Sequence, residues 1–161
     1  TPYVICNGYM YDVLQGISDH AKLQIVLNAV EKGSNPWGCT DYLNQKKKIL
    51  ETGADVYELM NDYPVHTKAV LINDRLSVVG SYNLDMRSTY LDTELMLVID
   101  SEKLSQQIHE TESDYMEKSK EVLANGQETE GAKYQGKVLN RKKKLYYGVL
   151  RIIIRPLRQL L

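Results

Sequence analysis

Cysteine is scarce in this sequence, and its scarcity excludes two classes of protein. The 161 residues contain two cysteines, Cys6 and Cys39. Two thiols are too few for a disulfide framework, and their separation does not fit the spacing of metal-binding cysteines. We therefore expect both to be buried free thiols, as is usual on the reducing side of a membrane.

Long apolar runs are also missing. The sequence has no stretch of about 20 apolar residues that could span a bilayer as a helix. No signal peptide is visible at its start. The chain begins at Thr1-Pro2 inside a strand-like run and without an initiator Met. We expect the natural protein to begin further upstream.

Acidic residues are missing from the last part of the chain. Residues 137–161 contain eight Lys and Arg residues and no acid, whereas the other residues carry 12 bases and 21 acids. The net charge of −1 hides this asymmetry. An acidic body with a basic tail argues against a body that binds nucleic acid. It favours a tail that meets an anionic partner.

Composition and pattern together indicate a soluble α/β domain. The length suits one domain, and 43% hydrophobic with 25% charged residues is ordinary for a globular protein. Strand-like and helix-like runs alternate, which predicts a mixed β-sheet flanked by helices. The expected strands are 1–6, 23–30, 55–60, 69–72, 76–79 and 91–99, and the expected helices are 12–20, 42–52 and 101–123.

The start and end of the 42–52 helix have their own signals. Thr40 or Asp41 is expected to cap it, after a loop over 31–40, and Gly53 is expected to end it.

The most informative stretch runs from His66 to Glu94. Residues 69–72 are apolar and largely β-branched, which predicts a strand. Side chains two apart on a strand share a face, so His66 and Lys68 should point the same way. An imidazole beside an ammonium forms a site for an anion, and phosphate is the common one.

The residues after the next strand-like run can serve the same anion. Gly80 ends that run, where a backbone can come close to a ligand. Ser81 and Asn83 offer a hydroxyl and an amide. Glu94 follows in a third strand-like run, from which a carboxylate could orient a histidine ring and fix its tautomer.

Each of these residues has a simpler interpretation when taken alone. His66 could be a surface histidine, Lys68 a solvated charge, and Ser81 and Asn83 turn residues. Their joint spacing favours the catalytic interpretation.

This spacing resembles the HKD motif of the phospholipase D superfamily, which reads H-x-K, four residues, D, six residues, G-S-x-N. His66, Lys68, Gly80, Ser81 and Asn83 fall at the motif positions. Asn73 stands where the motif has an aspartate, and Asp74 follows one residue late. The flanking residues DMRS at 85–88 and LDTE at 91–94 are similar to the bacterial cardiolipin synthase-like branch.

The resemblance implies phosphodiester transfer on a phospholipid through a phosphohistidine, with no metal or other cofactor. Such enzymes use two motifs, and this chain is similar to the C-terminal half. The resemblance therefore makes His66 the general acid and base, with Glu94 as its orienting carboxylate. Lys68, Ser81 and Asn83 would bind the phosphoryl oxygens, while Asn73, Asp74 and Gly80 would support the site.

The implied partners are a membrane phospholipid, an anionic membrane surface and a second HKD half. That half would lie upstream in the same polypeptide or in a second copy of the chain. The implied location is the cytoplasmic face of the bacterial membrane. Two alternatives stay open: a homodimeric nuclease of the same superfamily, and a membrane-bound relative whose site has decayed.

The expected organisation has three parts. Residues 1–123 form the phospholipase D-like half, 124–136 a polar linker, and 137–161 a basic amphipathic segment. Tyr146 and Tyr147 suit a membrane–water boundary, and Pro156 should kink or break the helix. We expect an in-plane membrane helix, the alternative being a helix docked on the protein with its bases in water. The residues expected to bind the membrane are Lys142, Lys143, Lys144, Arg151, Arg155 and Arg158.

Overall fold

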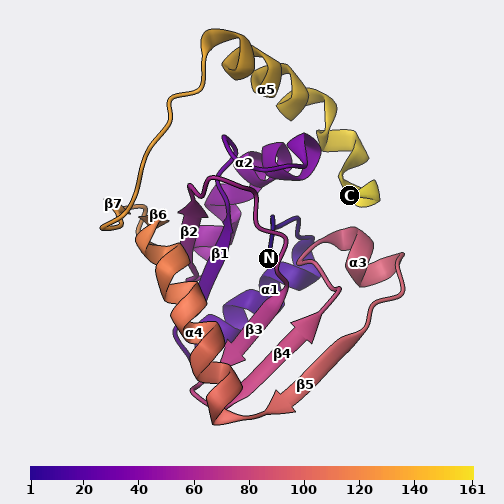
Figure 1. Ribbon diagram of the computed structural model, residues 1–161. Coiled ribbons are helices and arrows are strands. Elements are labelled where there is room, and N and C mark those ends of the chain that lie inside the picture. The colour runs from indigo at the N-terminus through magenta and orange to yellow at the C-terminus, as the bar shows by residue number, and fades with distance from the viewer.

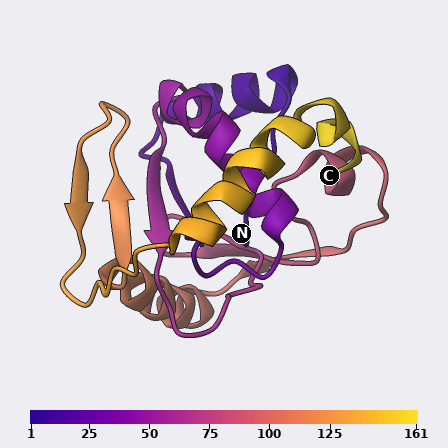
Figure 2. The same cartoon turned by 90° about the horizontal axis from the view of Figure 1, so that it is seen from above.

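Two β-sheets pack against helices in the computed structural model (Figures 1 and 2). It describes the backbone of residues 1–161 and every side chain except that of Gln159. The helices are α1 (Gly8–Ser18), α2 (Pro36–Glu51), α3 (Met86–Tyr90), α4 (Glu102–Glu117), α5 (Arg141–Ile153) and the 3₁₀ helix η1 (Arg155–Leu160). The strands are β1 (Gln24–Asn28), β2 (Asp55–Leu59), β3 (Ala69–Ile72), β4 (Leu76–Gly80), β5 (Met96–Asp100), β6 (Ser119–Val122) and β7 (Glu128–Glu130).

The first sheet has the order β1-β2-β6-β7, and the second has the order β3-β4-β5. Strands β1 and β2 are parallel, and the other pairs are antiparallel. The N-terminal residues join the first sheet to the loop that follows β4, because the Pro2 carbonyl accepts from Asn28 N–H at 3.2 Å and Ile5 N–H donates to the Leu84 carbonyl at 2.9 Å. The predicted α/β fold, a mixed sheet flanked by helices, is confirmed.

Helices cover both faces of the first sheet. Helices α1 and α2 pack on β1 and β2 around a core that includes Leu14, Tyr42 and Val56. Helix α4 lies on the other side (Figure 2). It reaches the second sheet, where the Ser105 and Ser77 hydroxyls are 2.8 Å apart. Burial of these apolar faces holds the layers together.

Helix α2 begins earlier than the sequence pattern indicated. The side chain of Asn35 accepts hydrogen bonds from the N–H groups of Trp37 at 3.1 Å and Gly38 at 3.2 Å, and a proline follows the cap. An Asn cap with Pro at the first helical position is a strong start signal. The expectation of a cap at Thr40 or Asp41 was therefore wrong, since both are buried inside the helix.

The end of α2 agrees with the prediction. The helix stops at Glu51, and Gly53 adopts a φ of +87° just beyond it. Glycine takes this left-handed conformation without the penalty of a side chain.

The region after α4 differs from the expected helix over 101–123. Helix α4 ends at Glu117, and β6 pairs antiparallel with β2, with Val122 opposite Val56. Val122 is buried there, so the sheet edge and the core outweigh the local helical pattern. Strand β7 then forms within the range expected to be a linker.

The C-terminal segment lies against the protein. Helix α5 lies beside α2 in Figure 1 and crosses it in the view of Figure 2, and η1 turns toward α3. Leu150 and Ile154 are buried, and the Tyr147 hydroxyl donates to the Val30 carbonyl at 3.4 Å. Among the described residues, no helix combines the length and the apolar character needed to cross a membrane.

Candidate phosphate-binding site

His66 and Lys68 meet on the extended segment that leads into β3. The Nζ of Lys68 lies 2.6 Å from Nδ1 and 3.1 Å from Nε2 of His66, and it also donates to the His66 carbonyl at 2.9 Å. His66 is exposed, and Lys68 is half-buried. The alternation of an extended chain thus brings the two side chains together, as the pattern indicated.

The electrostatics of this pair favour a neutral imidazole. Partial burial and then the charge of Lys68 lower the pKa of His66 below its usual range. Partial burial also lowers the pKa of Lys68, although the charges of Glu94 and Asp85 act in the opposite direction. A neutral imidazole can accept a proton, which is the state that a general base requires.

Glu94 contacts Ser81. The Ser81 hydroxyl donates to the Glu94 carboxylate and accepts from Leu95 N–H at 3.0 Å. Strand β5 begins only at Met96, opposite Gly80, and this register places the preceding residues beside Ser81. The strand expected from 91 was thus too long. The structure brings Glu94 to the serine, and its role as the orienting carboxylate of His66 stays a prediction that the resemblance implies.

Asn83 is held by the start of helix α3. Its N–H donates to the Ser88 hydroxyl at 3.3 Å, while the buried Asp85 caps α3 by accepting from Ser88 N–H at 2.6 Å. The Oδ1 of Asn83 is buried and has no hydrogen-bond partner among the described residues. Its side chain therefore keeps one unused acceptor. The sequence reasoning missed the supporting roles of Asp85 and Ser88.

Gly80 serves the packing of the hairpin. A Cβ at this position would lie 2.1 Å from the Leu95 carbonyl oxygen and 2.5 Å from the Met96 sulfur. The close approach that glycine permits here is between β4 and the chain entering β5, and its approach to a ligand stays a prediction.

Asn73 and Asp74 lie at the far end of the same hairpin. Both are exposed in the turn between β3 and β4, and Asn73 has a φ of +54°. Asn adopts this left-handed conformation more readily than most residues. The whole of β3 separates the turn from Lys68, so the structure gives Asn73 a role in the turn, while its support of the site stays a prediction.

A cavity of about 280 Å³ lies behind the segment that carries His66 and Lys68. Val65, Thr67 and Ala69 line it, together with Ile108 and Tyr115 from α4. On an extended chain, Val65, Thr67 and Ala69 point away from His66 and Lys68. The cavity is therefore separate from the candidate phosphate site.

The fold is that of the phospholipase D proteins. The phosphatidylserine synthase from Haemophilus influenzae Rd KW20 superposes with a TM-score of 0.68 and 15% identity, covering 100% of this chain and 40% of that chain. The phospholipase D family member Nuc from Salmonella typhimurium gives a TM-score of 0.59 and 15% identity, covering 80% of this chain and 78% of that chain.

Residues 1–114 match the family described as "Cardiolipin synthase, PLD-like domain", and the chain belongs to this family. Cardiolipin synthase A from Proteus mirabilis (strain HI4320) is 31% identical over 146 residues, covering 88% of this chain and 28% of the relative. Cardiolipin synthase A from Buchnera aphidicola subsp. Schizaphis graminum is 37% identical over 73 residues, covering 45% of this chain and 15% of the relative. The chain thus spans only a minor part of the relatives it matches.

Proposed function

We propose that this chain supplies one half of a site for phosphodiester transfer on membrane phospholipids, through a phosphohistidine intermediate. The observation that carries the proposal is the contact between His66 and Lys68, with the Nζ 2.6 Å from Nδ1. Ser81 and Asn83 follow β4, which pairs with the strand that His66 and Lys68 precede. An exposed imidazole and ammonium suit a phosphodiester that arrives from solvent or from a lipid surface.

The proposed reaction has two steps. His66 takes up a proton from solvent once the anionic phosphodiester offsets the charge of Lys68. A histidine of a second half then attacks phosphorus, and the bond to the leaving oxygen breaks as His66 gives that oxygen its proton. The neutral His66 then takes the proton of an incoming alcohol or water. The oxygen of that molecule forms the new bond to phosphorus, and the bond from phosphorus to the histidine of the second half breaks. The Lys68 ammonium and the side-chain N–H of Asn83 stabilise the charge on the non-bridging oxygens. The Ser81 hydroxyl joins them by turning its proton from the Glu94 carboxylate to the phosphoryl oxygen.

The outward face of the second sheet supports the need for a second half. On an extended chain every second side chain lies on the same face, which here holds residues 66, 68, 70 and 72. Val70, Ile72 and Val98 are exposed on this face. Exposed apolar patches of this kind mark interaction surfaces. A second half that covers this face would bring its own histidine toward His66.

Complementation tests the proposed function. Residues 1–161 alone should show no transfer as a monomer, because the chain carries one HKD histidine. Activity on phosphatidylglycerol should return with the second half, or in a dimer that pairs two copies, and His66→Ala should abolish it without loss of folding. The exposed His109 provides the matched control, since His109→Ala should keep full activity.

Sedimentation analysis must establish the state of each preparation. Turnover by a demonstrably monomeric chain, or substantial transfer by His66→Ala, would contradict the proposal. Cleavage of DNA without any action on phospholipid would favour the nuclease alternative.

We also propose that helix α5 contacts an anionic membrane. Its outward side carries Leu145, Tyr146, Val149, Ile152 and Ile153, all at least 49% exposed. The basic residues expected to bind lipid divide into two groups. Arg151 and Arg158 contact α2, whereas Lys142, Lys143, Lys144 and Arg155 are exposed. Apolar side chains flanked by bases suit the headgroup region of an anionic bilayer.

A further inference from the structure

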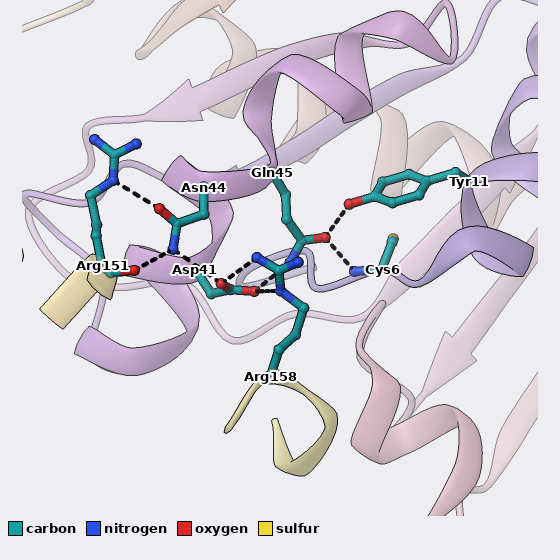
Figure 3. Close-up of polar contacts among 7 residues, drawn as sticks. All are labelled: Cys6, Tyr11, Asp41, Asn44, Gln45, Arg151 and Arg158. Atoms are coloured by element: carbon teal, nitrogen blue, oxygen red, sulfur yellow. Dashed lines mark hydrogen bonds and ion pairs between the residues drawn. The ribbon is translucent and has the colours of Figure 1, made fainter. Parts of the chain in front are cut away.

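The C-terminal segment contacts a buried carboxylate of helix α2. Asp41 lies inside α2 and is 0% exposed. Arg158 of η1 binds it in a bidentate manner, with Nε 2.7 Å from Oδ2 and Nη2 2.9 Å from Oδ1 (Figure 3). A buried carboxylate that loses such a partner is left with an uncompensated charge. Arg158 is therefore a structural partner of α2.

The pair lies at the centre of a wider network, which Figure 3 shows. Each carboxylate oxygen of Asp41 accepts from a second residue of α2 in addition to Arg158. The same network reaches the start of the chain and helix α5. Its other members are Cys6, Tyr11, Asn44, Gln45 and Arg151.

The segment that carries Arg158 also contacts helix α3. The N–H of Arg87 donates to the Leu161 oxygen at 2.9 Å, and the end of the yellow segment lies beside α3 in Figure 1. Helix α3 has only five residues, so it cannot be stable without contacts from other elements. Its Ser88 in turn accepts the hydrogen bond from Asn83 N–H. Contacts therefore run without a gap from Asp41 to the loop of the candidate site.

We propose that Arg158 and Asp41 are positioning residues: their ion pair is a latch that holds η1 against α3 and so fixes the loop 81–83. Neither residue touches the substrate in this proposal. The expected effect on catalysis rests on the proposed function, whereas the expected effect on the loop does not.

Hydrogen–deuterium exchange in the full polypeptide tests the latch directly. Arg158→Met should make the amides of residues 81–92 exchange several-fold faster than in the wild type, because α3 loses its support. Arg155→Met is the matched control, since Arg155 is exposed on the same segment and has no ion pair among the described residues. Unchanged exchange at 81–92 in Arg158→Met would overturn the proposal.

A double variant separates positioning from simple charge compensation. Asp41→Asn combined with Arg158→Met leaves no buried charge unpaired, so thermal stability should return toward that of the wild type. Fast exchange at 81–92 should persist. The kcat for transfer should stay lowered by roughly tenfold or more with KM little changed, because misplaced groups weaken the reaction more than binding.

Recovery of both loop protection and kcat together with stability would show that the pair only neutralises charge, and would overturn the latch. If the wild-type polypeptide shows no transfer on phospholipid, the proposed function fails, and the exchange measurement still decides the latch.

Discussion

The ammonium of Lys68 lies 2.6 Å from Nδ1 of His66, so a positive charge on one group disfavours a positive charge on the other. A proton on the imidazole would place two cations side by side, and this repulsion adds to the effect of burial in lowering the pKa of His66. The arrangement favours the neutral form of His66. In the proposed reaction, His66 becomes protonated when an anionic phosphodiester enters and offsets the charge of Lys68.

Lys68→Met should raise the pKa of His66. The substitution removes the repulsive charge but keeps an apolar stem, so the protonated imidazole becomes more favourable. NMR titration of the His66 ring protons measures the shift, and the His20 signal in the same spectrum is the internal control because its ring contacts the Gly16 carbonyl instead. A fall in the pKa of His66, or no change, would show that Lys68 does not control this titration.

Features that depend only on residues close together in the sequence could be predicted from local patterns. The meeting of His66 and Lys68 follows from the alternation of an extended chain, which needs no knowledge of the rest of the fold. The start of α2 was also locally encoded, in Asn35 and Pro36, although the sequence interpretation placed the cap at Thr40 or Asp41.

The remaining features depend on contacts between distant residues. The contact of Glu94 with Ser81 requires the register of β4 on β5, which no local pattern specifies. The pair of Asp41 and Arg158 joins residues 117 apart in the sequence. A charged residue inside a helix gives no sign of its partner, so the basic tail could only be interpreted from its charge.

Asn73 should matter for the hairpin turn more than for catalysis. Its φ of +54° disfavours β-branched residues, so Asn73→Val should lower the free energy of unfolding. We expect a loss of about 1–2 kcal/mol, measured by urea denaturation. Asn73→Gly should be close to neutral because glycine accepts this conformation.

The same position distinguishes an intact site from a decayed one. Asn73→Asp should leave the transfer rate of the active assembly within about tenfold, or about 1.4 kcal/mol of barrier. A change from no activity to high activity would instead support a site that has decayed through loss of the motif aspartate.

Gly80 should tolerate no side chain. A Cβ there would lie 2.1 Å from the Leu95 carbonyl oxygen, so Gly80→Ala must displace the chain that carries Glu94 and enters β5. We expect a loss of about 1–3 kcal/mol in the free energy of unfolding. Gly148 on α5 is the matched control, since a Cβ there meets nothing within 4 Å. Gly148→Ala should be neutral or stabilising, and equal effects at both glycines would contradict this account.

The outward side of α5 should contribute to membrane binding through apolar contact. Ile152 is 71% exposed, so Ile152→Gln should leave folding unchanged. Loss of a buried isoleucine at a lipid interface costs about 1.5–3 kcal/mol, so binding to phosphatidylglycerol vesicles should weaken by roughly tenfold or more. Co-sedimentation at low and high salt measures this, and high salt should weaken binding further by screening the bases.

Val98 provides the matched control, because it is also 71% exposed but lies on the second sheet. Val98→Gln should sediment with vesicles as the wild type does. Deletion of residues 137–161 is a poorer test, since it also removes Arg158 from the buried Asp41 and so disturbs the body of the protein. Equal sedimentation of the wild type and of Ile152→Gln would mean that α5 serves only as a docked helix. Its exposed apolar side would then have to meet a protein surface instead of lipid.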